Sequence, residues 1–148
     1  MAKAERRAEV TWQGNLVQGS GRIDSVGSGA FGNLPVTWAS RTESSDGKTS
    51  PEELIAAAHA SCFAMALSHG LAQGGTPPER LHVSAVSTFE QVEGGFRITT
   101  MNLDVQGKVP GLDQAGFEAA ARQAGEGCPV SNALRNNVDI RVRAHLEA

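Results

Sequence analysis

The 148-residue sequence predicts a single domain, residues 1–148, that mixes β-strands with α-helices. Segments near both ends of the chain alternate apolar and polar residues, which is typical of strands with one buried face. Between them, residues 50–71 are rich in Ala, Leu, Met and Phe and carry few charges, which is typical of a helix buried on most of its circumference. A chain of this length is long enough to form a hydrophobic core.

The N-terminal part reads as short strands separated by glycines, with apolar centres at residues 10–12 and 34–38. Between these centres, residues 27–32 match the GxGxxG spelling of a dinucleotide-binding loop. Such a loop must open a helix, and the Asn-Leu-Pro sequence that follows does not continue as one. We therefore predict a glycine-rich hairpin connection here, and a polar loop over residues 41–49.

A helix-start signal stands at Ser50. Ser50 is a good N-cap, Pro51 suits the first helical position, and Glu53 completes a capping box with Ser50. Glu52 is thereby left without a capping role. We expect this helix to run to about Leu71, where glycines and prolines end it.

The second half of the chain predicts a β-hairpin from residues 81–90 and 96–109. The apolar series changes parity between Ile98 and Met101, so we expect a bulge near residues 99–100. The elements predicted after the hairpin are a helix capped by Asp113 and ending near Gly127, a short helix that begins at Cys128, and a last strand over residues 138–146.

Composition argues against several kinds of partner. The net charge is −3 and charged residues make up 20% of the chain, so no basic surface predicts nucleic-acid binding. No apolar run approaches the roughly 18 residues of a membrane span, and the first residues lead into no apolar signal-peptide core. We therefore expect a cytoplasmic protein that binds neither nucleic acid nor membrane. In that reducing compartment, two cysteines are more often catalytic, redox-active or buried than a structural disulfide.

The two cysteines stand in different local surroundings. Cys62 lies in the middle of the apolar helix, where burial disfavours its thiolate unless a cation compensates. Cys128 lies directly before Pro129, at an expected N-cap where free amides and the helix dipole favour a negative charge. Local physical chemistry alone therefore favours Cys128 as the nucleophile.

His59 and Cys62 share a helix face at spacing i, i+3, which fits a Cys/His dyad, two ligands of a metal site, or a packed histidine. His69, His82 and His145 have no ligand spacing that would complete a zinc site.

An arginine is the other side chain that can hold a thiolate, because it keeps its charge and can bridge a sulfur and a carboxylate. Arg22 and Arg41 both precede the helix, and Glu52 could orient one of them. The alternative for Glu52 is a solvated carboxylate that interacts with the helix dipole.

Two separated motifs resemble those of a known family. The first is residues 50–67, Ser-Pro-Glu-Glu-Leu-Ile-Ala-Ala-Ala-His-Ala-Ser-Cys-Phe-Ala-Met-Ala-Leu, and the second is residues 127–131, Gly-Cys-Pro-Val-Ser. With residues 10–15 and 109–113, they make nearly the whole chain similar to the OsmC/Ohr family of osmotically inducible and organic hydroperoxide resistance proteins. The sequence around His59 favours the OsmC branch.

The resemblance implies a cysteine-based peroxidase that needs no haem, metal or flavin, so no cofactor and no metal site are expected. By position, Cys62 matches the peroxidatic cysteine and Cys128 the resolving cysteine that forms a disulfide with it. This reverses the local preference for Cys128 as the nucleophile. Glu52 matches the active-site glutamate, and Arg41 fits the arginine of the OsmC branch better than Arg22 does.

The resemblance also implies an antioxidant role in oxidative and osmotic stress. Its substrates would be organic hydroperoxides and hydrogen peroxide, and its reductant an external thiol or dithiol. The implied fold is α+β, with central helices wrapped by antiparallel β-sheets in an intertwined homodimer. About 15 Å of straight helix separates Glu52 from Cys62, so Arg41 or a second chain must bridge them. The alternative function is a redox sensor or lipid hydroperoxide binding module that uses the same cysteine pair stoichiometrically.

Overall fold

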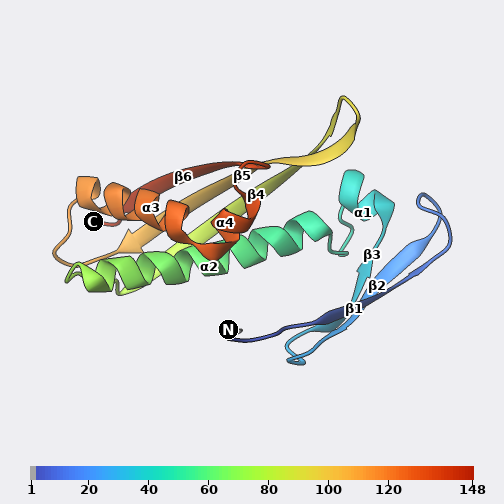
Figure 1. Ribbon diagram of the computed structural model, residues 1–148, viewed down its shortest axis with the longest axis horizontal. Helices are drawn as coiled ribbons and strands as arrows, with labels where there is room; N and C mark the ends of the chain where they lie inside the picture. Colours follow the sequence, from blue (N-terminus) through green and yellow to red (C-terminus); the bar gives the residue numbers. More distant parts are fainter. Residues whose placement is uncertain (1–2) are drawn as a thin grey trace. The chain divides into compact units, whose positions relative to one another are not determined.

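The computed structural model describes residues 3–148, which form two compact units that divide between Pro51 and Glu52. Within this described range, the first unit holds three strands and a short helix, and the second is built from three strands and three helices (Figure 1). The predicted mixture of helices and strands is confirmed, and the fold is α+β. The prediction of a single domain over residues 1–148 stays a prediction.

The first unit is built on an antiparallel sheet with strand order β1-β2-β3. Its strands are β1 (Ala8–Gln13), β2 (Ser20–Val26) and β3 (Gly32–Val36). The register places Val10 opposite Ile23 and Trp12 opposite Gly21, so these positions share one apolar face. Gly21 is needed there because a Cβ atom would lie 2.5 Å from the Trp12 ring. The glycine-rich run between β2 and β3 joins two antiparallel strands, which confirms the predicted hairpin connection.

A short helix, α1 (Trp38–Thr42), follows β3. Thr37 caps it: the Ser40 amide donates to the Thr37 hydroxyl at 3.0 Å, and the Thr37 amide donates to the Ser40 hydroxyl at 2.9 Å. The prediction of strand and loop was therefore wrong over these residues. The capping box was not recognised because a serine occupies the position where the usual motif has Glu or Gln.

The second unit is a three-stranded sheet with two longer helices on one of its faces. Its elements are α2 (Pro51–Gln73), β4 (Arg80–Val92), β5 (Gly95–Lys108), α3 (Gln114–Gly127), α4 (Pro129–Leu134) and β6 (Asp139–Leu146). β4 and β5 pair antiparallel, but β6 pairs parallel to β5, so this sheet is mixed and not wholly antiparallel as expected. The reason is that α3 and α4 form the crossover that a parallel pairing requires.

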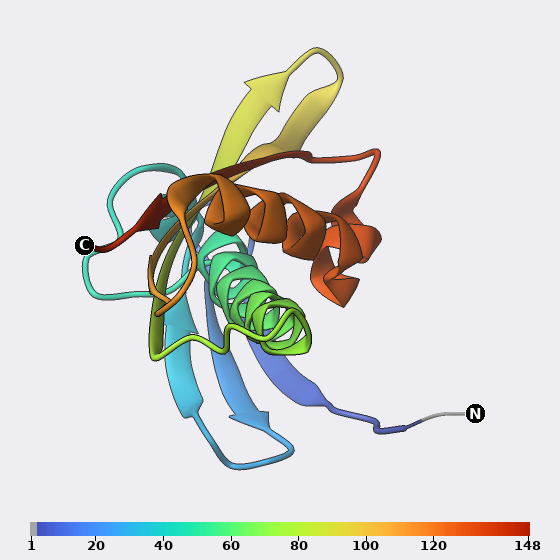
Figure 2. The same cartoon turned by 90° about the vertical axis from the view of Figure 1, so that its left-hand side faces the viewer.

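The core of the second unit lies between α2, α3 and the sheet, where both helices cover the same face (Figure 2). The largest buried side chains come from all three layers, with Phe63 and Leu67 from α2, Met101 and Leu103 from β5, and Phe117 from α3. Each such side chain contributes about 1.5–3 kcal/mol when fully buried. Because Phe63 and Leu67 point into this core, the packing sets the rotation of α2 about its axis. It therefore also sets the directions of the other side chains on α2.

The predicted bulge in the hairpin is confirmed. Thr88 pairs with Thr100 and Phe89 pairs with Ile98, so Thr99 is the extra residue. One extra residue shifts the side-chain alternation, which keeps the apolar positions before and after it on the same face.

Helix α2 corrects one expectation about membranes. By length and composition alone it is long and apolar enough to cross a bilayer, so the expectation that no apolar run approaches the length of a membrane span is wrong. The core helix of a soluble protein passes the same test. In this helix Phe63, Leu67 and Leu71 are buried in the core of the second unit, but Met65 is 68% exposed. The expectation of burial on most of the circumference is therefore wrong for the single chain, and burial against the sheet accounts for the apolar residues of one face only.

Candidate active site

The two cysteines meet in the second unit although 66 residues separate them in the sequence. The Sγ atoms of Cys62, on α2, and Cys128, at the start of α4, lie 2.9 Å apart. Both thiols are free, and the distance exceeds the roughly 2.05 Å of a disulfide bond. Cys128 is completely buried, whereas Cys62 is half-buried and so offers the more accessible sulfur.

The position of Cys128 follows from its place between two helices. Its amide donates to the carbonyl of Ala124 at 3.0 Å, which ends α3, and its extended backbone serves as the N-cap of α4. Pro129 occupies the first turn of α4, where its missing N–H costs nothing. The prediction that Cys128 begins a short helix is confirmed.

Hydrogen bonds favour the thiolate of Cys128. Burial by itself would raise the pKa of Cys128. Hydrogen bonds with Cys62 and with both the amide and the hydroxyl of Ser131 outweigh burial, and the pKa of Cys128 is lowered below its ordinary value. The amide of Val130 acts in the same direction.

Cys62 has the opposite tendency. Burial raises the pKa of Cys62, and the hydrogen bond and charge of the neighbouring Cys128 raise it further. The amide of Val130 lowers it only in part. Within the second unit, the pKa shifts of the two thiols therefore have opposite directions, lowered for Cys128 and raised for Cys62.

His59 lies one turn before Cys62, and its ring hydrogen-bonds to Ser131. The distance from His59 Nε2 to Ser131 Oγ is 2.7 Å, and both side chains are completely buried. Burial lowers the pKa of His59, which keeps the ring neutral. Sequence reasoning missed Ser131, although the residue stands three positions after the predicted N-cap, where a side chain faces back to the start of a helix.

A metal site was one of the alternatives for His59 and Cys62. Among residues 3–148, no three or more His, Cys, Asp or Glu side chains are grouped so as to hold a metal ion.

The two candidate arginines differ in their surroundings within the first unit. Arg22, on β2, forms an ion pair with Asp24 at 2.8 Å and is largely exposed. Asp24 also accepts a hydrogen bond from the Thr11 hydroxyl at 2.7 Å. Arg41, on α1, lies over the ring of Trp38, with its guanidinium carbon 5.9 Å from the ring centroid. The roles of both arginines stay predictions.

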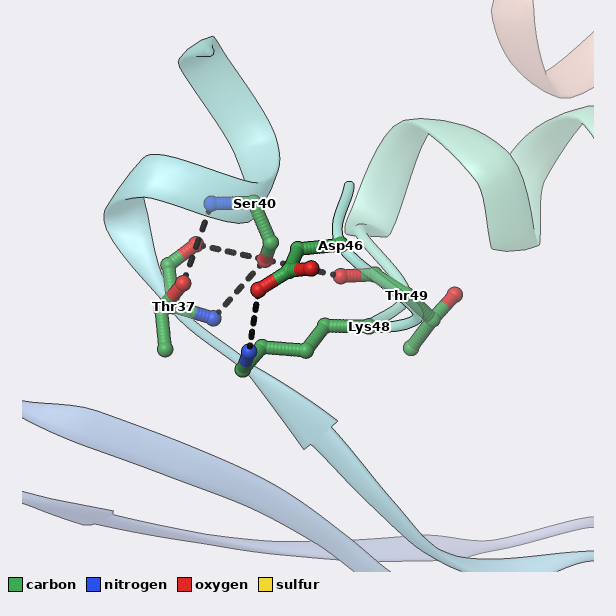
Figure 3. Close-up of polar contacts among 5 residues, drawn as sticks. All are labelled: Thr37, Ser40, Asp46, Lys48 and Thr49. Atoms are coloured by element: carbon green, nitrogen blue, oxygen red, sulfur yellow. Dashed lines mark hydrogen bonds and ion pairs between the residues drawn. The ribbon is translucent and has the colours of Figure 1, made fainter. Parts of the chain in front are cut away.

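A hydrogen-bond network holds the helix that carries Arg41 against the segment that leads into α2 (Figure 3). The buried Ser40 hydroxyl lies 2.9 Å from the Thr37 carbonyl and 3.1 Å from the Thr49 carbonyl, and its single proton is shared between these two acceptors. The Thr49 amide donates in turn to Pro35 at 3.1 Å. Residues 35–49 therefore form a closed loop whose two ends are tied together.

Glu52 lies in the first turn of α2 and is 6% exposed. The alternative of a solvated first-turn carboxylate is therefore wrong. Its predicted role in orienting an arginine stays a prediction.

The chain is similar to a protein family, to individual proteins and to solved structures. It matches the family described as OsmC-like protein over residues 44–143. It is 36% identical over 135 residues to Peroxiredoxin OsmC of Escherichia coli (strain K12), covering 91% of this chain and 93% of that protein. It is 34% identical over 93 residues to an organic hydroperoxide resistance protein of Xanthomonas axonopodis pv. citri (strain 306), covering 62% of this chain and 63% of that protein. Among solved structures, the organic hydroperoxide resistance protein OhrB of Bacillus subtilis superposes with a TM-score of 0.74 at 27% identity, covering 93% of this chain and 97% of that one.

Proposed function

Because this chain belongs to the OsmC-like protein family, we propose that it is a thiol-dependent peroxidase that reduces organic hydroperoxides and hydrogen peroxide. The observation that carries the proposal is the pair of free thiols 2.9 Å apart, one buried and one half-buried. Relatives named Peroxiredoxin OsmC and organic hydroperoxide resistance protein support a peroxidase-type role.

In the proposed reaction, the Cys62 thiolate attacks the nearer oxygen of the hydroperoxide. The O–O bond breaks, the sulfur is oxidised by two electrons to a sulfenic acid, and the other oxygen leaves as alcohol or water after taking up a proton. The Cys128 thiolate then attacks the Cys62 sulfur, an S–S bond forms, and hydroxide leaves as water. Two equivalents of an external thiol, or one dithiol, reduce the disulfide and are themselves oxidised.

The raised pKa of Cys62 makes a cation necessary for the first step at neutral pH. We assign this role to Arg41, oriented by Glu52, because a guanidinium keeps its charge and can bridge a sulfur and a carboxylate. Arg22, which forms an ion pair with Asp24, is the weaker candidate, because Arg41 fits the arginine of the OsmC branch better.

The proposed functional unit is a homodimer in the cytoplasm. Large apolar side chains stay exposed in the single chain, and a second copy would cover them. They are Val10, Trp12, Leu16, Val17, Phe31, Met65, Val86 and Phe96. In a reducing compartment two cysteines are more often catalytic or redox-active than a structural disulfide, which is consistent with the proposed role.

Turnover separates the proposed enzyme from a redox sensor with the same cysteine pair. With excess dithiothreitol, we expect peroxide to be consumed steadily over many equivalents, whereas a sensor would consume about one. Cys62→Ser should abolish consumption. Cys128→Ser, the matched control, should still allow one rapid oxidation and then become overoxidised more easily, because its sulfenic acid has no internal thiol to trap it. Steady turnover by Cys62→Ser would overturn the assignment.

A further inference from the structure

We propose that His59, acting through Ser131, holds the Cys128 sulfur ready to close the disulfide, so that His59 is a positioning residue for the second step of the reaction. This inference rests on the proposed function. It concerns a histidine and a serine to which the proposed first step gives no role.

The geometry consists of a row of buried polar groups that joins α2 to α4. The ring of His59 contacts the Ser131 hydroxyl at 2.7 Å. Ser131 stands three residues after Cys128, the N-cap of α4, and its hydroxyl favours the Cys128 thiolate. His59, Ser131 and Cys128 are all 0% exposed. A completely buried polar group lowers the stability of the fold unless it has a hydrogen-bond partner. The hydrogen bonds of this row therefore hold its three side chains in one arrangement.

The direction of the hydrogen bonds follows from counting protons. A hydroxyl has one proton, so Ser131 can donate to Cys128 only if it accepts from His59 Nε2. In the neutral ring this requires the tautomer with the proton on Nε2. Among residues 3–148, the buried Nδ1 atom of His59 has no hydrogen-bond partner, and a bare ring nitrogen fits such a position better than an orphaned N–H. The row therefore runs from His59 to Ser131 to Cys128.

Few ionisable groups act on Cys128 in the described part of the chain. Within the second unit, Cys62 contacts Cys128 and His59 contacts Ser131, and both titratable groups come from α2. The proposed Arg41 and Glu52 would act on Cys62. Three polar groups of α4 favour the Cys128 thiolate, namely the hydroxyl and amide of Ser131 and the amide of Val130. The pH dependence of disulfide closure should therefore report the hydrogen bond from Ser131.

The sign of the effect is fixed by the state that the hydrogen bond stabilises. Ser131 stabilises the thiolate, so removing its hydroxyl raises the pKa of Cys128 and moves the pH midpoint of disulfide closure upward. A hydrogen bond to a charged group is strong enough to move that midpoint by about one pH unit, which slows closure roughly tenfold near neutral pH. Oxidation of Cys62 by peroxide is a separate step and should keep its rate within about twofold.

The test follows both steps at several pH values. Reduced protein is mixed with one equivalent of a hydroperoxide, quenched with an alkylating agent and analysed by mass spectrometry, which distinguishes sulfenic acid from disulfide. Ser131→Ala and His59→Met should both slow closure and move its midpoint upward. His59→Gln is the conservative control, because its amide nitrogen can replace Nε2 as a donor, and it should restore most of the rate. The double variant should be no slower than Ser131→Ala alone.

Several results would overturn the inference. These are an unchanged midpoint in Ser131→Ala, additive effects of the two substitutions, or equal slowing of both steps, which would indicate a merely structural role. A measurement without peroxide distinguishes failure of the proposed role of His59 from failure of the proposed peroxidase function. In a Cys62→Ser background, Cys128 is the only remaining cysteine, and the rise of its thiolate ultraviolet absorbance with pH should move to higher pH on adding His59→Met. If the wild type forms no sulfenic acid while this shift is present, the peroxidase proposal fails and the role of His59 stands.

Discussion

Closing the disulfide should make the protein markedly more stable. A bridge between Cys62 and Cys128 spans 66 residues, and loop-closure entropy assigns about 4 kcal/mol to a loop of that size. The sulfurs need to approach by only about 0.9 Å, from 2.9 Å to the roughly 2.05 Å of the bond, so little native structure has to move. For a chain of this length, that free energy raises the melting temperature by roughly 8–16 °C.

The assay compares thermal unfolding of protein oxidised with one equivalent of peroxide and of protein reduced with dithiothreitol, at one protein concentration. Cys128→Ser treated in the same two ways is the control, and its two melting temperatures should agree. If the wild type forms the disulfide by mass spectrometry yet melts equally in both states, the closed geometry is strained or the loop is already constrained when unfolded. Either outcome would refute the reasoning.

Three further predictions concern the site, the core and the assembly. Arg41→Ala should slow the oxidation of Cys62 near neutral pH far more than Arg22→Ala, and Arg41→Lys should restore part of the rate. Stopped-flow oxidation measures the rate of each variant, and a larger loss of rate in Arg22→Ala would reverse the assignment. Gly107→Ala should destabilise the protein by about 1–3 kcal/mol in urea unfolding, because its Cβ would meet the buried Phe117 ring, whereas Gly70→Ala, a helical site with open space, should be neutral or stabilising. Light scattering at micromolar concentration should give the mass of a dimer, and a monomeric mass would contradict the proposed assembly.

Local signals in the sequence predicted the elements that depend on neighbouring residues. The Asp113 side chain accepts from the Gly116 amide at 2.8 Å and caps α3, as its position suggested. The change of parity in the apolar series predicted the bulge, whose extra residue is Thr99. Cys128 is an N-cap because Pro129 follows it. In each case the cause lies within a few residues of the effect.

The features that sequence reasoning missed depend on partners far along the chain. Ser131 meets His59 across 72 residues, and no spacing rule connects them. The parallel pairing of β6 with β5 is set by how α3 and α4 pack, which alternation within β6 does not reveal. Ser40 was missed for another reason, since it completes the capping box of a helix too short to show a periodic pattern.

The unequal exposure of the two sulfurs bears on how the oxidised protein returns to its starting state. A reductant that approaches from solvent reaches Cys62, since Cys128 is completely buried and Cys62 is half-buried. In the proposed cycle, attack there would form a mixed disulfide on Cys62 and expel the Cys128 sulfur. A thiol with a lowered pKa is the better leaving group, so the hydrogen bonds that favour the Cys128 thiolate also speed its departure. The buried cysteine would thus serve as nucleophile in one half of the cycle and as leaving group in the other.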